Sequence, residues 1–298
     1  MTRQKSVHYL ALSTVALWSS AYVFTKLALE HYTSSSLGLI RCAVATGVLA
    51  VILLGRKTPG PKAGDLPWLI LSGAVGFAVY LLAFNRGSEI LSPTTSCLII
   101  STAPIISALL ARICFRESLS RSGWLAMIIA FCGVMVMRLR EGTLDLSTGV
   151  WWMLMAALSI SAYSLLQRKL ALKYDPLTIT GYSFAAATLL LAVFAPEAAV
   201  QLREAAAPQV VLALFLGIFP SALAYQLWSI ALSRANRTST VTNYMFLTPF
   251  LTGLLEFAVI RQAPEGRTVL GGLIIIGGLM LFAFKGEKRP VSRDNGGP

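Results

Sequence analysis

Tyrosine residues recur at matching places in the two halves of this sequence, and they are side chains that could do chemistry. Tyr80 precedes Pro104 by the same interval as Tyr225 precedes Pro249. An aromatic ring with a polar tip can stack on a small molecule and also form a hydrogen bond with it. Such residues bind amphipathic compounds. The sequence has no nucleophile–base pair and no paired carboxylates with which to catalyse a reaction on them.

Other aromatic and polar residues extend this candidate binding site. Tyr80 and Phe84 are four residues apart, and Tyr225 and Trp228 are three apart, so each pair would share one face of a helix. The amide of Asn243 has two donors and an acceptor with which to pair an ammonium or a carboxylate. Each of these side chains could instead pack between helices or hydrogen-bond within them. The remaining candidates for the lining of the site are Trp18, Ser20, Tyr22, Tyr163 and Tyr244.

Two prolines are the candidate hinges. Pro104 and Pro249 lie in the middle of apolar runs, where a proline removes a backbone hydrogen bond and kinks a helix. Equivalent kinks would let each half of the molecule bend to open one side, and Pro220 and Gly76 could assist. A static structural kink is the alternative explanation.

Charged residues inside the apolar runs are few. Glu256, Lys26 and Arg41 are the clear cases, and each lies toward one end of its run. We expect Glu256 to pair with Lys26 or Arg41, as a structural contact or as a gate, because an unpaired charge is costly there. No histidine or cysteine spacing indicates a metal, so we expect neither metal nor cofactor.

The elements that position these residues are membrane helices. Of 298 residues, 56% are hydrophobic and 13% are charged, and the mean hydropathy is +0.70. A soluble globule could not be covered by so few polar side chains, so the chain must lie in a bilayer. We predict an all-α integral membrane protein with ten transmembrane helices, at residues 7–29, 37–54, 66–84, 90–111, 123–137, 149–166, 177–195, 210–232, 239–260 and 269–284.

Short sequence repeats indicate that the membrane unit is duplicated. Ser-Ala-Tyr occurs at residues 20–22 and again at 161–163, and Lys-Leu-Ala-Leu occurs at 26–29 and at 169–172. Duplicated membrane units are typical of secondary transporters.

We therefore expect a first five-helix repeat at residues 1–140, a second at 141–285, and a disordered cytoplasmic tail at 286–298. If the N-terminus is cytoplasmic, the inner segments hold 17 basic residues and the outer ones hold 6, so both termini should lie inside. Because five is odd, the second repeat is inverted relative to the first. The substrate site should lie in a central cavity between the two inverted repeats.

A family resemblance supports this organisation. Pro104, the apolar run 108–115, the segment Arg-Glu-Ser-Leu-Ser at 116–120 and the glycine-containing span after it resemble the end of each repeat in EamA-type members of the drug/metabolite transporter superfamily. Gln262 replaces the glutamate of that segment in the second half, so a role of this glutamate cannot extend there. With Trp-Ser-Ser at 18–20, the chain is most similar to inner-membrane amino-acid exporters of the YddG kind.

The resemblance implies a transporter of the bacterial inner membrane that exports amino acids, aromatic or other neutral ones, or related small metabolites by alternating access. We expect a monomer or weak homodimer whose partners are its substrate and membrane lipid. The net charge of +12 is explained by the positive-inside bias, so we expect no nucleic acid. Efflux of drugs or organic cations, an integral-membrane lipid enzyme, and a membrane scaffold or receptor remain as alternatives. The first span has no acidic residue at its middle, where small multidrug-resistance relatives carry their carboxylate.

Overall fold

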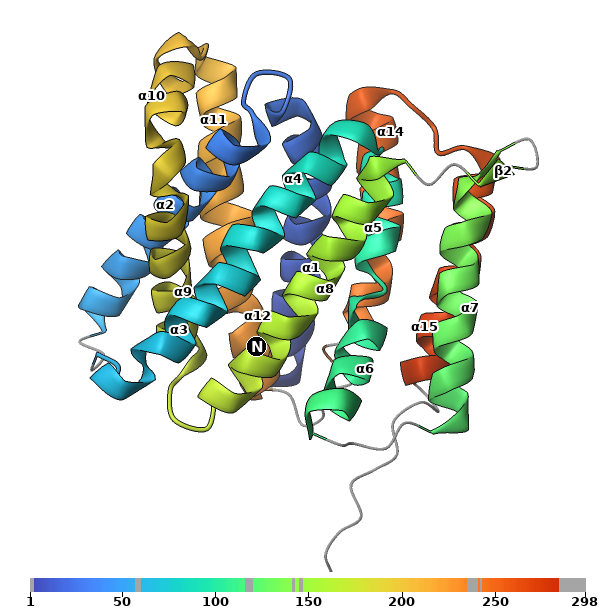
Figure 1. The fold of residues 1–298 in the computed structure, drawn as a ribbon, viewed down its shortest axis with the longest axis horizontal. Coiled ribbons are helices and arrows are strands. Elements are labelled where there is room, and N and C mark those ends of the chain that lie inside the picture. The colour runs from blue at the N-terminus through green and yellow to red at the C-terminus, as the bar shows by residue number, and fades with distance from the viewer. Residues whose placement is uncertain are drawn as a thin grey trace, which may run out of the picture.

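The protein is a bundle of helices (Figure 1). Its computed structural model describes residues 3–56, 60–115, 120–140, 143–144, 147–234, 241 and 243–283. In the first half, the elements are α1 (Arg3–Ala28), α2 (Ser34–Gly55), η1 (Ala63–Asp65), α3 (Leu66–Gly73), η2 (Ala74–Val79), α4 (Tyr80–Ile90), α5 (Pro93–Ile100), α6 (Ala103–Phe115) and α7 (Arg121–Arg138).

The second half repeats this order of elements closely. A two-residue antiparallel ladder pairs β1 (Leu139–Arg140) with β2 (Thr143–Leu144) between the halves. In the second half, the elements are α8 (Thr148–Leu170), α9 (Pro176–Leu191), η3 (Ala192–Phe194), α10 (Ala195–Glu204), α11 (Ala207–Leu216), η4 (Gly217–Leu223), α12 (Ala224–Arg234), η5 (Asn243–Leu247), α14 (Thr248–Ile260) and α15 (Gly266–Leu281).

Seven helical stretches among the described residues are long and apolar enough to cross a bilayer. They coincide with seven of the ten predicted spans: Ser6–Ala28, Ser34–Gly55, Ala63–Ile90, Pro93–Cys114, Thr148–Leu170, Pro176–Glu204 and Ala207–Ala231. The other three predicted spans fall on shorter apolar helices, Arg121–Met137, Tyr244–Ile260 and Gly266–Leu281.

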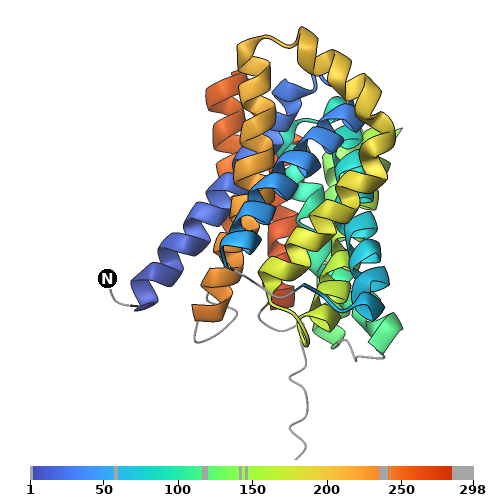
Figure 2. The ribbon, with the colours of Figure 1, turned by 90° about the vertical axis from the view of Figure 1, so that its left-hand side faces the viewer.

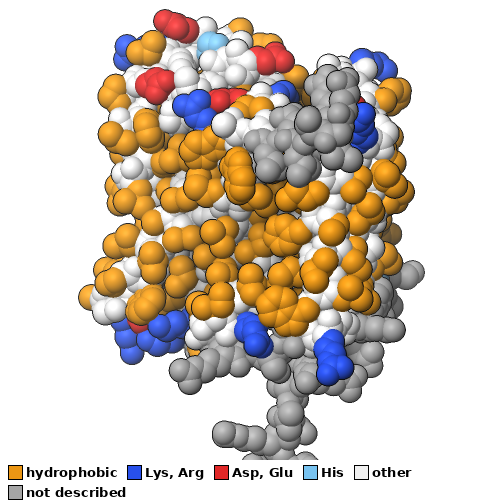
Figure 3. Space-filling model, turned by 45° about the vertical axis from the view of Figure 1, so that its right-hand side comes forward, with side chains coloured by type: hydrophobic (Ala, Val, Ile, Leu, Met, Phe, Trp, Pro, Cys, Tyr) orange, Lys and Arg blue, Asp and Glu red, His pale blue; other side chains and the backbone are white. Residues whose placement is uncertain are grey.

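The surface of the bundle is suited to lipid. Figure 3 shows a broad band of hydrophobic side chains, with charged side chains gathered at its two ends. Within this surface, Leu54 and Leu189 are 78% and 77% exposed. So much exposed apolar surface would drive a soluble protein to aggregate, whereas lipid accommodates it. The protein is therefore a multi-pass membrane protein, as its composition predicts.

Interruptions of the helices recur at similar places in the two halves. The π-helical turn η2 ends immediately before Tyr80, and the π-helical turn η4 ends just before Tyr225. In η4, Pro220 has no N–H to donate to the carbonyl of Leu216, and the hydroxyl of Ser221 donates to that carbonyl instead, at 2.8 Å. π-Helical turns are frequent at functional sites because they displace side chains and free backbone carbonyls.

The fourth helix of each half is also broken. In the first half α5 ends at Ile100 and α6 begins at Ala103, and in the second half η5 leads into α14.

Small residues let helices of the two halves approach closely. A side-chain carbon added at Gly133 of α7 would lie 2.7 Å from the carbonyl oxygen of Gly271 in α15. One added at Gly278 would lie 2.9 Å from the carbonyl oxygen of Ala126. Membrane helices associate by this kind of close backbone contact, because lipid provides no hydrophobic force to drive them together.

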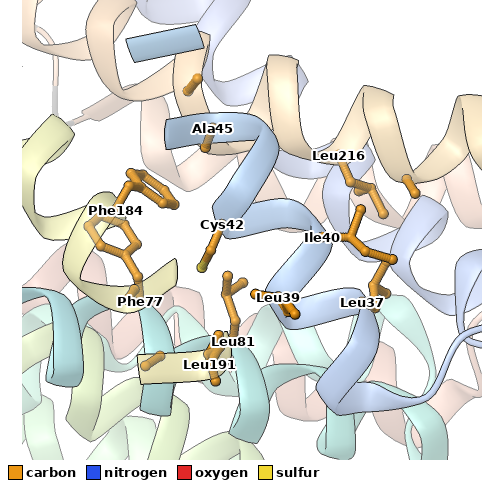
Figure 4. Packing of buried hydrophobic residues seen from close by; sticks show 14 of the residues in the cluster. Leu37, Leu39, Ile40, Cys42, Ala45, Phe77, Leu81, Phe184, Leu191 and Leu216 are labelled. Carbon is orange, nitrogen blue, oxygen red and sulfur yellow. The ribbon is translucent and has the colours of Figure 1, made fainter. Parts of the chain in front are cut away.

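A large cluster of buried hydrophobic residues lies around α2, between the two halves (Figure 4). Phe77 of η2 stacks on Phe184 of α9, with ring centroids 3.7 Å apart. Across the α2–α9 contact, the hydroxyls of Thr46 and Thr188 are hydrogen-bonded at 2.9 Å. In Figure 2, α1 begins at the lower end of the bundle, and α10 and α11 meet at its upper end.

Candidate functional site

Six aromatic rings from both halves form a connected cluster, which includes the stacked pair Phe77 and Phe184. Trp18 of α1 contacts Tyr225 and Trp228 of α12, with ring centroids 5.6 Å and 5.2 Å apart. Tyr225 contacts Phe77 of η2 at 5.6 Å, and Phe77 contacts Tyr163 of α8 at 5.0 Å. The structure thus joins Trp18, Tyr163, Tyr225 and Trp228, all four of which the sequence nominates. Phe77 is an addition that the sequence analysis missed, because an apolar ring in an apolar run carries no signal.

A second group of predicted residues lies on α1 and α4. Tyr22 contacts Phe84 at 5.3 Å, and Tyr80 stacks against Phe84 at 5.6 Å. Tyr22 and Phe84 are buried. Tyr80 and Tyr225 are both half-buried and pack against the same hydrophobic core around α2, so the two tyrosines related by the repeat lie on one core.

The structure places three other candidates elsewhere. Ser20 donates its hydroxyl to Leu17 of its own helix, at 2.8 Å. The hydroxyl of Tyr244 lies 2.8 Å from Nδ1 of His8, near the start of α1, and Tyr244 packs there against the same small hydrophobic cluster as Trp228. Asn243 belongs to η5, but its side chain lies outside the described part of the structure.

Hydroxyls of α1 and α8 bind the broken helices of the opposite half. Ser19 donates to the carbonyl of Thr248 at 3.2 Å, and Ser161 donates to the carbonyl of Ala103 at 2.9 Å. Each of these carbonyls belongs to the residue before a predicted hinge proline. The residue of the first half that corresponds to Ser161 by this contact is Ser19. The Ser-Ala-Tyr repeat aligns Ser161 with Ser20 instead, so that alignment is shifted by one residue.

The hinge prolines begin helices rather than kink them. α5 ends at Ile100 and Pro104 lies in the first turn of α6, while Pro249 lies in the first turn of α14. A first-turn proline removes no intrahelical hydrogen bond, because that N–H has no partner there anyway. The expectation that each proline removes a bond from a continuous helix is thus wrong, although each span is broken at the expected place.

Pro220 and Gly76 lie in the two π-helical turns. Pro220 is buried inside η4. Gly76 lies in η2, where an added side-chain carbon would be 2.3 Å from Cδ2 of Tyr163. Glycine is therefore required at this position by the close approach of an aromatic ring of the site.

The predicted pairing of Glu256 is wrong. Its carboxylate accepts hydrogen bonds from the backbone N–H of Thr94, at 2.8 Å, and from the hydroxyl of the same residue. Lys26 donates to the carbonyls of Ser88 and Glu89, at 3.0 Å and 2.8 Å. Among the described residues the ion pairs lie elsewhere, at Arg86–Glu89 and Lys173–Asp65. Glu256 and Lys26 are thus each bound by other groups and form no ion pair with each other.

Arg41 of α2 is a site residue that the sequence analysis did not nominate. It is 4% exposed, and its guanidinium carbon lies 5.9 Å from the ring centroid of Phe84. Nη1 donates to the hydroxyl of Thr25 at 3.2 Å, and Nε and Nη2 donate to the hydroxyl of Ser221 at 3.4 Å and 3.3 Å. The available signal was a charge inside a membrane span, which marks a functional residue by default.

A separate groove of about 340 Å³ lies at the edge of the bundle. Two serines and an arginine line it together with four hydrophobic residues, and none of the predicted site residues contributes to it. Ser34, Ser35, Val79, Leu82, Arg86, Trp152 and Met155 line this groove.

Comparison with known proteins identifies relatives along the whole chain. The chain is 28% identical to a probable terminal-alkyne amino-acid exporter of Streptantibioticus cattleyicolor, over 98% of both chains. It is 27% identical to the uncharacterized transporter YdfC of Bacillus subtilis, over 92% of this chain and 90% of that one. An S-adenosylmethionine uptake transporter of Rickettsia prowazekii is 25% identical, over 68% of this chain and 67% of its own.

The fold and the family are also matched. A crystal structure of another protein, 19% identical, superimposes with a TM-score of 0.62 over 93% of this chain and 96% of its own. The model of the EamA-like transporter family matches the chain twice, over residues 5–139 and 147–284. The chain therefore belongs to the EamA-like transporter family, within the drug/metabolite transporter superfamily.

Proposed function

We propose that this protein exports amino acids, or closely related small metabolites, across the bacterial inner membrane by alternating access. The observation that carries the proposal is the aromatic cluster in which Trp18 of the first half meets Tyr225 and Trp228 of the second. Rings contributed by both halves can close around an amphipathic molecule and separate when the halves move. The amino-acid exporter among the relatives, similar along 98% of the chain, supports this substrate class.

The proposed architecture has ten spans in two inverted five-helix repeats, residues 1–140 and 141–285, with residues 286–298 as a cytoplasmic tail. Two family matches and the recurrence of helix breaks at similar places in the two halves support it. α1 begins and α15 ends at the same end of the bundle (Figure 1), as an even number of crossings requires. The excess of basic residues in the inner segments makes that end cytoplasmic.

The proposed movement uses the broken helices. Ser19 and Ser161 connect α1 and α8 to the helix breaks of the opposite half. A movement of α1 or α8 would therefore displace the break in the other half. Bending at Pro104 and Pro249 would then expose the aromatic cluster to one side at a time.

The direction of transport belongs to this proposal. One relative is named for export and another for uptake. The exporter matches the larger share of the chain, and we therefore infer export. An organic cation is the alternative substrate, because aromatic faces also attract cations.

The test is counterflow in liposomes that contain the purified protein. Vesicles loaded with unlabelled L-propargylglycine, L-phenylalanine or L-leucine should accumulate the same labelled amino acid. Tyr225→Ala should raise the KM of the exchanged amino acid by about tenfold, since the substrate loses a stacking partner. Tyr9→Ala is the matched control, because Tyr9 also lies on a membrane helix but is 61% exposed. Exchange of organic cations with no exchange of any of the three amino acids would contradict the proposed function.

A further inference from the structure

Lys26, Arg41 and Glu256 are the charged side chains within the spans predicted from the sequence, and two of these three are satisfied by the protein. The ammonium of Lys26 is bound by two backbone carbonyls, and Glu256, Glu89 and Glu30 supply negative charge around it. The carboxylate of Glu256 is bound by the backbone and side chain of Thr94. Neither group needs a ligand to compensate its charge.

Arg41 is different, because no carboxylate of the described residues forms an ion pair with it. A guanidinium has five N–H donors, and the bonds of Arg41 to described residues engage three of them. All three bonds end on neutral hydroxyls at 3.2–3.4 Å, and two of them share the single oxygen of Ser221. Within the described chain, Arg41 takes part in no ion pair. A buried cation without a counterion is costly, so such a group in a membrane span calls for a functional explanation.

The guanidinium faces the aromatic rings of the candidate site. Its central carbon lies 5.9 Å from the ring centroid of Phe84. Phe84 stacks against Tyr80, which packs on the same hydrophobic core as Tyr225 of the other half. A molecule held between these tyrosines would therefore have the free donors of Arg41 within its reach.

The π-helical turn η4 orients this cation. Because Pro220 leaves the carbonyl of Leu216 without its usual donor, the hydroxyl of Ser221 donates to that carbonyl. The lone pairs of the same oxygen then accept from Nε and Nη2 of Arg41. At the matching place 145 residues earlier stands Gly76, against which Tyr163 packs. Only the π-helical turn of the second half thus has a hydroxyl that binds Arg41, although Tyr80 and Tyr225 occur at equivalent places in both halves.

We propose that Arg41 binds the carboxylate of the substrate, so that the transporter selects amino acids and other carboxylate-bearing molecules over organic cations. A carboxylate matches the planar fork of a guanidinium with two oxygens and supplies the missing negative charge. The side chain of the substrate would then stack among Tyr80, Tyr225 and Trp18. This inference rests on the proposed function, because it takes the aromatic cluster as the transport site.

The first test changes only the ligand. The amino acid that the wild-type protein exchanges fastest, among L-propargylglycine, L-phenylalanine and L-leucine, is compared with its own carboxamide in counterflow. The carboxamide keeps the ammonium and the side chain, but a neutral amide replaces the negatively charged carboxylate. Its KM should be roughly 10- to 100-fold higher, as expected when a charged hydrogen-bonding partner is lost. Equal KM values for the two compounds would overturn the role of Arg41 and leave the proposed function standing. If none of the three amino acids is exchanged, both the role of Arg41 and the proposed function are contradicted.

The second test changes Arg41. Arg41→Gln should raise the KM of the amino acid roughly 10- to 100-fold and leave that of the carboxamide within about twofold, so that the selectivity disappears. Arg41→Lys keeps the charge but not the fork, so its selectivity should be intermediate. Arg86→Gln, at an exposed arginine paired with Glu89, is the control and should behave as wild type.

A purely structural role predicts a different result. Arg41→Gln would then raise both KM values by the same factor, and this outcome would overturn the proposal. If Arg41→Gln does not insert into the membrane, Arg41→Lys decides the matter. Unchanged selectivity in Arg41→Lys would then count against the fork geometry, and reduced selectivity would support it.

Discussion

At the scale of single residues, the site depends on how closely its side chains are packed. Tyr163 is 2% exposed and lies against the backbone of Gly76, with no space between them for a side chain. The same ring touches Phe77, which in turn touches Tyr225. A small displacement of Tyr163 would therefore be transmitted to the tyrosine that we place next to the substrate.

Gly76→Ala should destabilise the protein by about 1–3 kcal/mol, because the new methyl group must push Tyr163 aside in a dense core. Gly47→Ala is the matched control, since an added carbon at Gly47 of α2 meets nothing within 4 Å. Its stability should be unchanged or slightly higher. Thermal unfolding in detergent, followed by tryptophan fluorescence, measures both. Equal melting temperatures for the two variants would show that η2 and Tyr163 accommodate the added methyl group without loss of stability.

At the scale of the helices, breaks in equivalent places are the main feature. The break before Pro104 is bound by Ser161, and the break before Pro249 is bound by Ser19, so each lies at a contact between the halves. The two positions are not equally packed, because Pro104 is exposed and Pro249 is buried. The two halves therefore need not bend by the same amount.

Pro104→Ala and Pro249→Ala should fold and insert but should transport several-fold more slowly. Alanine allows α5 and α6, or η5 and α14, to become one continuous helix, which biases the population toward one facing state. Pro176→Ala is the control, because Pro176 also lies in the first turn of a helix, α9, but follows a loop residue, Asp175, that caps the helix, and adjoins no such break. Counterflow rates in liposomes measure the effect. Wild-type rates in both single variants and in the double variant would place the hinge elsewhere.

At the scale of the whole molecule, orientation follows from charge. If the N-terminus is cytoplasmic, the inner segments of the proposed topology hold 17 basic residues and the outer ones hold 6. The band of apolar side chains separates charged ends of the bundle (Figure 3). An odd number of spans in each half would make the halves inverted. Inversion allows one site to be presented to either side of the membrane by the same movement.

A phosphatase that is active only outside the cytoplasm should therefore be inactive when fused after Gly286. It should be active when fused after Gly142, between the two halves, because five spans precede that point. Protein levels of the two fusions, measured by immunoblot, provide the control for expression. Strong activity after Gly286 would mean an odd number of crossings and would remove the case for inverted repeats.

The sequence alone determined the membrane class, the family and the places of the seven long apolar helices. These are local properties, because about 20 apolar residues must cross a bilayer whatever their neighbours are. The pair Tyr80 and Tyr225 was found for a related reason, since a duplicated sequence leaves matching residues at a fixed spacing of 145. The aromatic candidates on α1, α4, α8 and α12 followed from residue type, which limits where a polar ring can lie in lipid.

Only the tertiary structure decided which side chains meet. The contact of Ser19 with Thr248, the placement of Tyr244 beside His8, and the binding of Glu256 by Thr94 all join residues more than 150 positions apart. The uncompensated charge of Arg41 likewise emerges only when its neighbours are known. Hydropathy depends on one residue at a time, whereas a hydrogen bond or a missing counterion depends on the helices that pack around it.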